Sequence, residues 1–419
     1  MPNNNPNQIN KDKKMDLTTA SQHIKSFRTA FEYAFMKREQ EILCLIVCLI
    51  VKKNIAIIGS YGEGKSQLSE QFAHNLTKSF YGIQFNRYTT PDEAIGHFSL
   101  AEMKNNDEYL RKTKGKLADN QICYMDEAFN ASGPMLQSMQ KMLNEKRVDL
   151  GNGSEKKIPM EMGIVSTNFH ISKEKLLAPL WDRFFLRIVS KNLFSKIKED
   201  EFMEFISKSE NGELGIVNCK LDNNVIDFIR SQIPNVNLSK EIHKKLFKLV
   251  DFCNSQKPKI NISPRRMIWI MEALKAMALI NGRLQVLDED LAILKHALWV
   301  HAEEIPTIAD KIDQMKKVSV VKELKDIYET IKKQHKKYLN LKTKIQNLNQ
   351  QSNKTVSDMQ ELRKLRNQLN SDSNKMIDEV MALQQEYSKQ VKNACDESKD
   401  LLESIGRYAN PDSSVLAMD

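Results

Sequence analysis

The amino-acid sequence predicts an α/β fold in which helices cover a parallel β-sheet, followed by an all-helical region and a long helical tail. Short apolar runs alternate with helical patterns in the first half of the chain. Glycine is concentrated in the same half, because only Gly282 and Gly406 lie beyond Gly215. No proline lies between Pro306 and Pro411, and proline is the residue that most strongly breaks helices.

Short, largely apolar runs in the first half are expected to be strands buried on both faces, as in parallel sheets. Helical patterns lie between these runs, which is typical of strands joined by helical crossovers. The expected strands are 55–58, 82–85, 122–125 and 162–166, and the expected helices include 65–77 and 133–143.

Residues 146–158 have two half-polar arms around Gly151-Asn152-Gly153, the pattern of an inserted β-hairpin. No further strand is expected after about Ser190.

The same patterns divide the chain into four parts. Residues 1–20 are rich in Asn, Pro and Lys and are expected to be a flexible tail. Residues 21–190 hold the α/β core and begin with a helical pattern over 21–51. Residues 191–306 show helical periodicity interrupted by prolines, as in a small helical domain. In residues 307–419 apolar residues recur at spacings of three and four, as in coiled-coil seams.

A polar stretch, residues 349–358, interrupts the apolar stripe of the tail. We therefore expect an antiparallel helical hairpin whose arms have roughly 45 residues and a length of about 65 Å. The alternative is a continuous rod that pairs between subunits.

Composition and charge argue against several classes of protein. The 419 residues are 41% hydrophobic and 28% charged, which favours folded domains over disorder. The longest apolar run, residues 42–51, is too short to cross a membrane, and the first twenty residues lack the apolar segment of a secretory signal. A cytoplasmic protein is therefore expected. The six cysteines form no CxxC pair, and the net charge of +9 is not gathered into a nucleic-acid-binding patch.

Residues 59–66 read Gly-Ser-Tyr-Gly-Glu-Gly-Lys-Ser and fit the phosphate-binding pattern G-x-x-x-x-G-K-[ST]. The glycines let successive backbone N–H groups face one point, and the N-terminus of the following helix adds a partial positive charge. Lys65 is expected to reach the β- and γ-phosphates, and the Ser66 hydroxyl to bind Mg²⁺. The expected nucleotide-binding residues are Gly59, Ser60, Tyr61, Gly62, Glu63, Gly64, Lys65, Ser66 and Gln67.

Acidic and amide residues end two of the predicted strands. Asp126 and Glu127 follow the strand 122–125, and ligands of such sheets bind at the carboxyl ends of the strands. Asp126 is expected to hold Mg²⁺ through water, and Glu127 to orient and deprotonate the attacking water. Asn168 follows the strand 162–166, where it either positions this water or caps a turn.

The order of these motifs resembles that of AAA+ ATPases of the MoxR group, and within it the RavA-like branch, over roughly residues 20–306. The matching segments are 59–66, 87–93 with Gly96 and 99–100, 125–127, 157–160, 166–168, 180–184, 262–266 and 281–283.

The resemblance implies a role for each matching residue. Lys65 and Ser66 match Walker A, Asp126 and Glu127 match Walker B, and Asn168 matches sensor 1. Arg183 matches the arginine finger, which reaches the nucleotide of a neighbouring subunit. Arg265 matches sensor 2, with Arg266 as a competing assignment. Without the resemblance, Arg183 would be interpreted as an ion-pair partner of Asp182 or Glu174.

The resemblance also implies ATP and Mg²⁺ as cofactors and a homo-oligomeric ring, expected to be hexameric. Such a ring would remodel or activate a partner protein or insert a cofactor into it, and the resemblance suggests a partner with a von Willebrand factor A (vWA) domain. The alternatives are a nucleic-acid-directed motor of a defence system and a nucleotide-gated scaffold that does not hydrolyse ATP. Glu63 departs from the family's loop, and an acid beside the phosphates should weaken binding unless it points outward.

Overall fold

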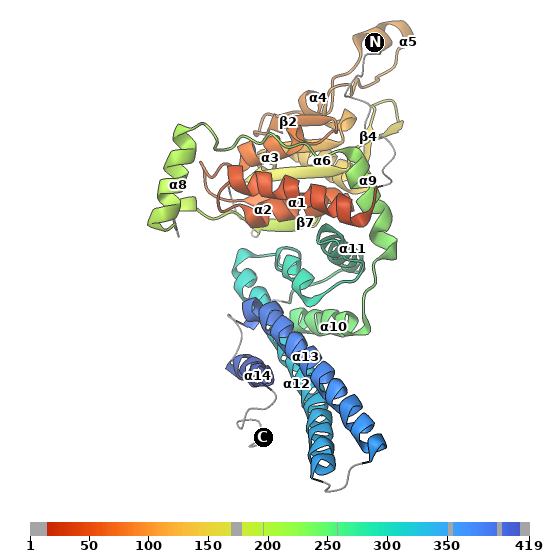
Figure 1. Ribbon diagram of the computed structural model, residues 1–419. Helices are drawn as coiled ribbons and strands as arrows, with labels where there is room; N and C mark the ends of the chain where they lie inside the picture. The colour runs from red at the N-terminus through yellow and green to blue at the C-terminus, as the bar shows by residue number, and fades with distance from the viewer. Residues whose placement is uncertain are drawn as a thin grey trace, which may run out of the picture. The chain divides into compact units, whose positions relative to one another are not determined.

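The computed structural model describes residues 15–168, 178–195, 197–257, 259–350, 355–391 and 396–410 (Figure 1). Contacts within the chain define two compact units, one up to Ile312 and the other from Asp313 onward. Within the described ranges, no helix combines the length and apolarity that a membrane span requires.

The first unit is built on a five-stranded parallel sheet with the strand order β2-β3-β6-β1-β7. β1 lies between β6 and β7, and all of its residues are buried, as the continuous apolar run predicts. This arrangement confirms the predicted fold class. The strands are β1 (Asn54–Ile58), β2 (Phe80–Gln84), β3 (Ile122–Asp126), β6 (Met162–Thr167) and β7 (Phe184–Val189).

β7 was not predicted from the sequence, because Arg187 interrupts its apolar run. The Arg187 side chain is nevertheless buried in the strand. Its guanidinium donates to the backbone oxygens of Trp299 at 2.5 Å and Trp181 at 3.1 Å, and it lies 4.8 Å from the centre of the Trp181 ring. These contacts compensate for the removal of a charge from water.

The helical pattern over residues 21–51 forms two helices, α1 (Leu17–Ala34) and α2 (Glu39–Val51). The helical conformation is interrupted between them, where Lys37 has a left-handed φ of 60°. α1 also begins within the predicted flexible tail, because the Asp16 side chain accepts the backbone N–H of Thr19 at 2.7 Å and caps the helix. α2 packs against β1 and β7.

The remaining elements of the core follow the predicted order. α3 (Lys65–His74) packs against β2, β3 and β6. The predicted hairpin consists of the antiparallel strands β4 (Arg147–Asp149) and β5 (Glu155–Lys157). The other helices of the core are α4 (Pro91–Ala94), α5 (Leu100–Asn106), α6 (Gly133–Glu145) and α7 (Ala178–Trp181).

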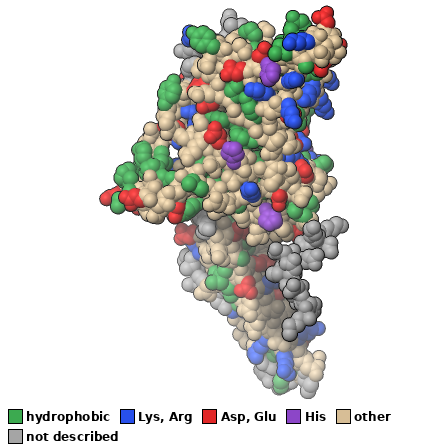
Figure 2. Space-filling model, turned by 90° about the horizontal axis from the view of Figure 1, so that it is seen from above, with side chains coloured by type: hydrophobic (Ala, Val, Ile, Leu, Met, Phe, Trp, Pro, Cys, Tyr) green, Lys and Arg blue, Asp and Glu red, His purple; other side chains and the backbone are tan. Residues whose placement is uncertain are grey.

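A group of helices follows the sheet. α11 starts at Pro264, where the Ser263 hydroxyl accepts the backbone N–H of Arg266 at 3.2 Å, and it packs against α2 and α9. α8 exposes Phe202, Met203 and Ile206, which form a hydrophobic patch together with Phe194 (Figure 2). The helices are α8 (Glu199–Glu210), α9 (Asn223–Gln232), α10 (Lys240–Ser255) and α11 (Pro264–Ile280).

The second unit contains most of α12 (Ile305–Asn349), together with α13 (Val356–Val391) and α14 (Asp396–Arg407). Gln334 donates to Glu379 at 3.1 Å and Arg366 donates to Asn349 at 3.2 Å, so α12 and α13 run antiparallel, as in the predicted hairpin. The second arm is shorter than predicted, since α13 is followed by the separate helix α14. One hydrophobic cluster of the unit is formed by the buried residues Leu324, Ile331, Val380, Ile405 and Tyr408.

A half-buried ion-pair network joins α9 to the sheet and to α2. Arg230 of α9 donates to the backbone oxygens of Leu49 at 2.6 Å and Ile50 at 3.2 Å, near the end of α2. Its guanidinium also contacts Glu161 at 2.8 Å, and Lys78 contacts the same carboxylate at 3.0 Å. Burial by itself raises the pKa of Glu161, but the ion pairs with Arg230 and Lys78 outweigh burial and lower it.

We expect Arg230→Ala to lower the free energy of unfolding by about 2 kcal/mol at pH 7, because helix carbonyls and a partly buried carboxylate lose their donor. The lowered pKa of Glu161 stabilises the fold above the unfolded-state pKa of about 4.3, and this stabilisation is lost as the pH falls through the folded-state pKa. Urea denaturation at pH 7 and at low pH measures both effects. The network is not stabilising if the variant and the wild type unfold at the same urea concentration at pH 7.

Candidate active site

The phosphate loop, residues 59–66, joins β1 to α3, and residues 61–67 line a pocket of about 520 Å³, the phosphate-loop pocket. Gly62 and Gly64 have φ angles of 76° and 72°, a region that favours glycine. Lys65 Nζ donates to the backbone oxygens of Gly59 and Ser60, each at 2.7 Å, and to Asn168 Oδ1 at 2.9 Å. Burial lowers the pKa of Lys65, although the carboxylates of Glu127 and Asp126 favour its charged form.

The residues predicted to bind Mg²⁺ lie together in this pocket. Ser66 Oγ donates to Asp126 Oδ2 at 3.2 Å, and the other carboxylate oxygen accepts a hydrogen bond from Ser166 Oγ. The Tyr124 hydroxyl lies 2.7 Å from Ser166 Oγ and extends this chain of hydrogen bonds. One hydroxyl and one carboxylate beside a phosphate-binding loop fit Mg²⁺, which takes few protein ligands and completes its shell with phosphates and water.

Glu127 is held by two amide side chains, one on each carboxylate oxygen. Asn168 Nδ2 donates to Oε1, and Asn130 Nδ2 donates to Oε2 at 3.2 Å. The backbone N–H of Glu127 donates to the oxygen of Ser166 at 2.9 Å, and its φ of 51° is left-handed. Burial, and next the nearby charge of Asp126, raise the pKa of Glu127. A carboxylate that is oriented on both oxygens and has a raised pKa is suited to act as a general base.

Asn130 was not predicted as a site residue. It follows the acid pair by three residues and lines the same pocket, so its position in the sequence was the available signal. The interpretation of Asn168 as a turn cap alone does not describe its contacts, because its amide joins Lys65 to Glu127.

Arg183 and Arg265 lie elsewhere, at the amino-terminal ends of β1 and β7. They line a second hollow of about 430 Å³, the basic pocket, together with Lys52, Lys53 and Lys146. Burial lowers the pKa of Lys146 to about 8. Within a single chain, these arginines are therefore on the opposite edge of the sheet from the phosphate loop.

The contacts of Arg265 and Arg266, the two candidates for sensor 2, differ, and so do those expected for Arg183. Asp182 contacts Arg187 at 3.9 Å and Arg266 at 3.5 Å rather than Arg183, while Glu174 lies outside the described residues. Arg266 is buried and donates to the backbone oxygens of Ala297 at 2.6 Å and Phe185 at 2.8 Å, which is a structural role. Arg265 is exposed and donates to Asn144 at 3.1 Å, so it can turn toward a ligand.

An apolar pocket of about 300 Å³ adjoins the phosphate loop and is suited to a nucleotide base. Phe35, Leu193 and Phe205 line it beside the loop residues Gly62 to Gly64. Gln67, the last predicted binding residue, lines both this pocket and the phosphate-loop pocket.

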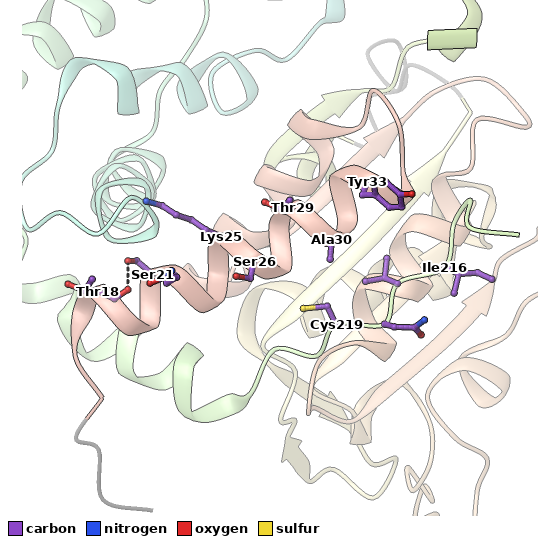
Figure 3. Close-up of a pocket in the computed structure, with 12 residues that line it drawn as sticks. Thr18, Ser21, Lys25, Ser26, Thr29, Ala30, Tyr33, Ile216 and Cys219 are labelled. Carbon is purple, nitrogen blue, oxygen red and sulfur yellow. Dashed lines mark hydrogen bonds between the residues drawn. The ribbon is translucent and has the colours of Figure 1, made fainter. Parts of the chain in front are cut away.

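A different groove, of about 860 Å³, runs between α1 and residues 216–219 and contains none of the predicted site residues (Figure 3). Its α1 side carries mainly hydroxyl and amide side chains.

Glu63, the unusual acid of the loop, does not point to solvent. Its side chain is only 5% exposed and contacts Arg38 at 2.9 Å, and Arg38 itself was not predicted as a site residue. No sequence motif connects the two residues, which lie on separate elements.

Comparison with known proteins agrees with this arrangement. Residues 22–212 match the family described as the MoxR domain of MoxR-vWA-beta-propeller ternary systems, and residues 241–312 match the AAA lid domain. An uncharacterized protein of Methanocaldococcus jannaschii is 27% identical over 392 residues, which cover 89% of this chain and 98% of that protein. A second uncharacterized protein of the same organism is 26% identical over 303 residues, 69% of this chain and 74% of its own length.

A crystal structure of a Cytophaga hutchinsonii protein, described as a candidate ATPase, has the same fold. Its TM-score is 0.55 at 19% sequence identity, and the match covers 70% of this chain and 96% of that one. The parallel sheet, the phosphate loop and the acid pair all lie within the range that matches the MoxR domain. The chain thus combines a segment similar to a MoxR domain, residues 22–212, with a following segment similar to an AAA lid domain, residues 241–312.

Proposed function

We propose that the chain binds ATP with Mg²⁺ in the phosphate-loop pocket and hydrolyses it at interfaces between copies of the chain, in order to remodel a partner protein. The observation that carries the proposal is the convergence of Lys65, Ser66, Asp126, Glu127 and Asn168 in one pocket. Phosphoryl transfer to water needs these parts: a phosphate cradle, metal ligands and a residue that positions the water.

Each residue has a distinct task in this reaction. Lys65 and the loop N–H groups bind the phosphates, while Ser66 and Asp126 would hold Mg²⁺, which neutralises the charge that develops on the phosphoryl oxygens. Glu127 accepts a proton from the attacking water, and the amides of Asn168 and Asn130 keep its carboxylate in place.

The basic pocket supports hydrolysis between subunits. Arg183 and Arg265 lie on the other edge of the sheet from the acid pair, so a second copy is needed to bring arginines to the triphosphate. An arginine supplied by a neighbour stabilises the transition state and is worth about 10³ to 10⁵ in rate. A head-to-tail contact of this kind forms a ring when the rotation between neighbours closes, and a ring is the assembly that we propose. Its hexameric state, a cytoplasmic location and membership of the RavA-like branch remain predictions.

The class of partner is proposed from the matching family, whose description names vWA and β-propeller proteins alongside the MoxR domain. We infer a vWA-domain protein as the partner that is remodelled, activated or loaded with a cofactor. The hydrophobic patch of Phe194 and α8 supports an assembly role for this surface, because exposed apolar patches mark interaction sites.

Glu127→Gln is expected to lower ATP turnover at least about 100-fold while ATP binding is retained, because the amide keeps the shape of the side chain but cannot take the proton. Phosphate release and the fluorescence of a labelled ATP analogue measure the two properties. Glu210→Gln, which removes an exposed carboxylate of α8, is the control. Unchanged turnover of Glu127→Gln would instead favour the scaffold that does not hydrolyse ATP.

Arg183→Ala is expected to leave ATP binding by a single subunit nearly intact and to lower turnover of the assembly about 1000-fold, because the finger acts on a neighbour's nucleotide. Mixing this variant with Glu127→Gln should restore part of the turnover, since some interfaces then pair an intact arginine with an intact base. Arg28→Ala, on the surface of α1, is the control. Turnover at the wild-type rate would remove Arg183 from the site.

The tail is proposed to serve assembly or partner binding rather than nucleotide affinity. The sequence placed its start at residue 307, but Ile308 and Ile312 are buried and belong to the first compact unit. A chain that ends at Lys316 is therefore expected to keep its ATP affinity within about threefold, whereas one that ends at Pro306 should lose at least about 2 kcal/mol of stability. Thermal unfolding and nucleotide titration of the two truncated chains test this proposal. A large loss of ATP affinity in the chain that ends at Lys316 would contradict a role of the tail in assembly or partner binding.

A further inference from the structure

Arg38 is a buried residue at the break between α1 and α2. Its side chain is 8% exposed, and its guanidinium contacts three separate parts of the chain. Nη1 contacts Glu41 of α2 at 3.1 Å. The same nitrogen donates to Ser190 Oγ and, at 2.9 Å, to the backbone oxygen of Lys191, just after β7.

The third contact is with the phosphate loop. Arg38 Nη2 donates to the backbone oxygen of Glu63 at 2.8 Å and to the Glu63 carboxylate at 2.9 Å. One nitrogen thus holds both the main chain and the side chain of the same loop residue. Arg38 lines the apolar pocket but not the phosphate-loop pocket, so it can act on a bound phosphate only through the loop.

The contact to the Glu63 carbonyl sets the direction of a backbone donor. In a planar trans peptide, the C=O of one residue and the N–H of the next point in opposite directions. When Arg38 holds the Glu63 oxygen on one side of the loop, the N–H of Gly64 is directed to the other side. Gly64, at a φ of 72°, lies between the loop's variable residues and Lys65, where N–H groups gather around phosphate.

The contact to the Glu63 carboxylate removes a charge conflict. A carboxylate in the loop lies close to the place of the phosphates, and like charges at short range repel strongly where water is excluded. Arg38 neutralises Glu63 and holds its carboxylate on the side of the apolar pocket. The acid therefore becomes an anchor for the loop.

We propose that Arg38 is a positioning residue of the nucleotide site: it fixes the Glu63–Gly64 peptide for phosphate binding and neutralises the loop acid. The inference rests on the proposed ATP binding in the phosphate-loop pocket. The hydrogen bonds of Arg38 go to Glu41, Ser190, Lys191 and Glu63 and not to the acid pair, so it acts on nucleotide binding and not on the chemical step.

The experiment measures affinity for ADP and ATP, and steady-state kcat and KM, for the full chain. Arg38→Ala is expected to weaken nucleotide binding about 10- to 100-fold, because the loop loses a charge-assisted anchor and the buried carboxylates of Glu63 and Glu41 lose their ion-pair partner. We expect kcat at saturating ATP to fall less than about threefold. Arg38→Ala should therefore act mainly on KM, whereas Glu127→Gln acts on kcat. Arg38→Lys keeps the positive charge but replaces the guanidinium with a single ammonium group. Its nucleotide affinity should lie between those of the wild type and Arg38→Ala.

Glu63→Gln in the Arg38→Ala background is the rescue. Removal of the Glu63 charge should raise nucleotide affinity at least about fivefold relative to Arg38→Ala alone. The single Glu63→Gln variant completes the double-mutant cycle. Arg230→Ala is the matched control, because it also removes a half-buried arginine that binds backbone oxygens and a carboxylate, but away from the loop. It should lower thermal stability without weakening nucleotide affinity.

The proposal is overturned if Arg38→Ala binds ADP and ATP within twofold of the wild type, or if Arg230→Ala loses as much affinity for the same loss of thermal stability. A fall in kcat with unchanged affinity overturns it as well. Should Arg38→Ala fail to fold, Arg38→Lys carries the same test. Failure of the wild type itself to bind any adenine nucleotide would instead overturn the proposed function.

Discussion

The parallel pairing of β1, β3 and β6 is the constraint on which the candidate active site depends. The residues that follow parallel strands lie together at the carboxyl ends of the strands, where ligands of such sheets bind. The register pairs Asp126 with Ser166 and Ile58 with Thr167, so the phosphate loop, the acid pair and Asn168 must meet there. A shift of one residue would turn these side chains to the other face of the sheet.

The same geometry separates the arginines from the acids. Arg183 precedes β7 and therefore lies at the opposite edge of the sheet from the residues that follow β3 and β6. Under the proposed function, this separation makes a lone subunit incomplete and couples hydrolysis to assembly.

Buried and half-buried arginines connect the peripheral elements to the sheet. Arg38, Arg187, Arg230 and Arg266 each donate to backbone oxygens and contact a carboxylate. Burial of a charge is costly unless its donors are satisfied, so each guanidinium fixes a specific arrangement of the segments it contacts. The lid, the α1–α2 break and the phosphate loop are thereby tied to the core by directional contacts as well as by apolar packing.

The sequence by itself determined the fold class, the phosphate loop and the acid pair, because apolar runs, glycines and the spacing of a motif are local properties of the chain. It also indicated the antiparallel α12 and α13, from one polar interruption in an apolar stripe. Only the tertiary structure decided which of Arg265 and Arg266 is buried, that Arg187 lies inside a strand, and that Glu63 is paired with Arg38. Those outcomes depend on contacts between residues far apart in the chain, and neither periodicity nor spacing carries information about such partners.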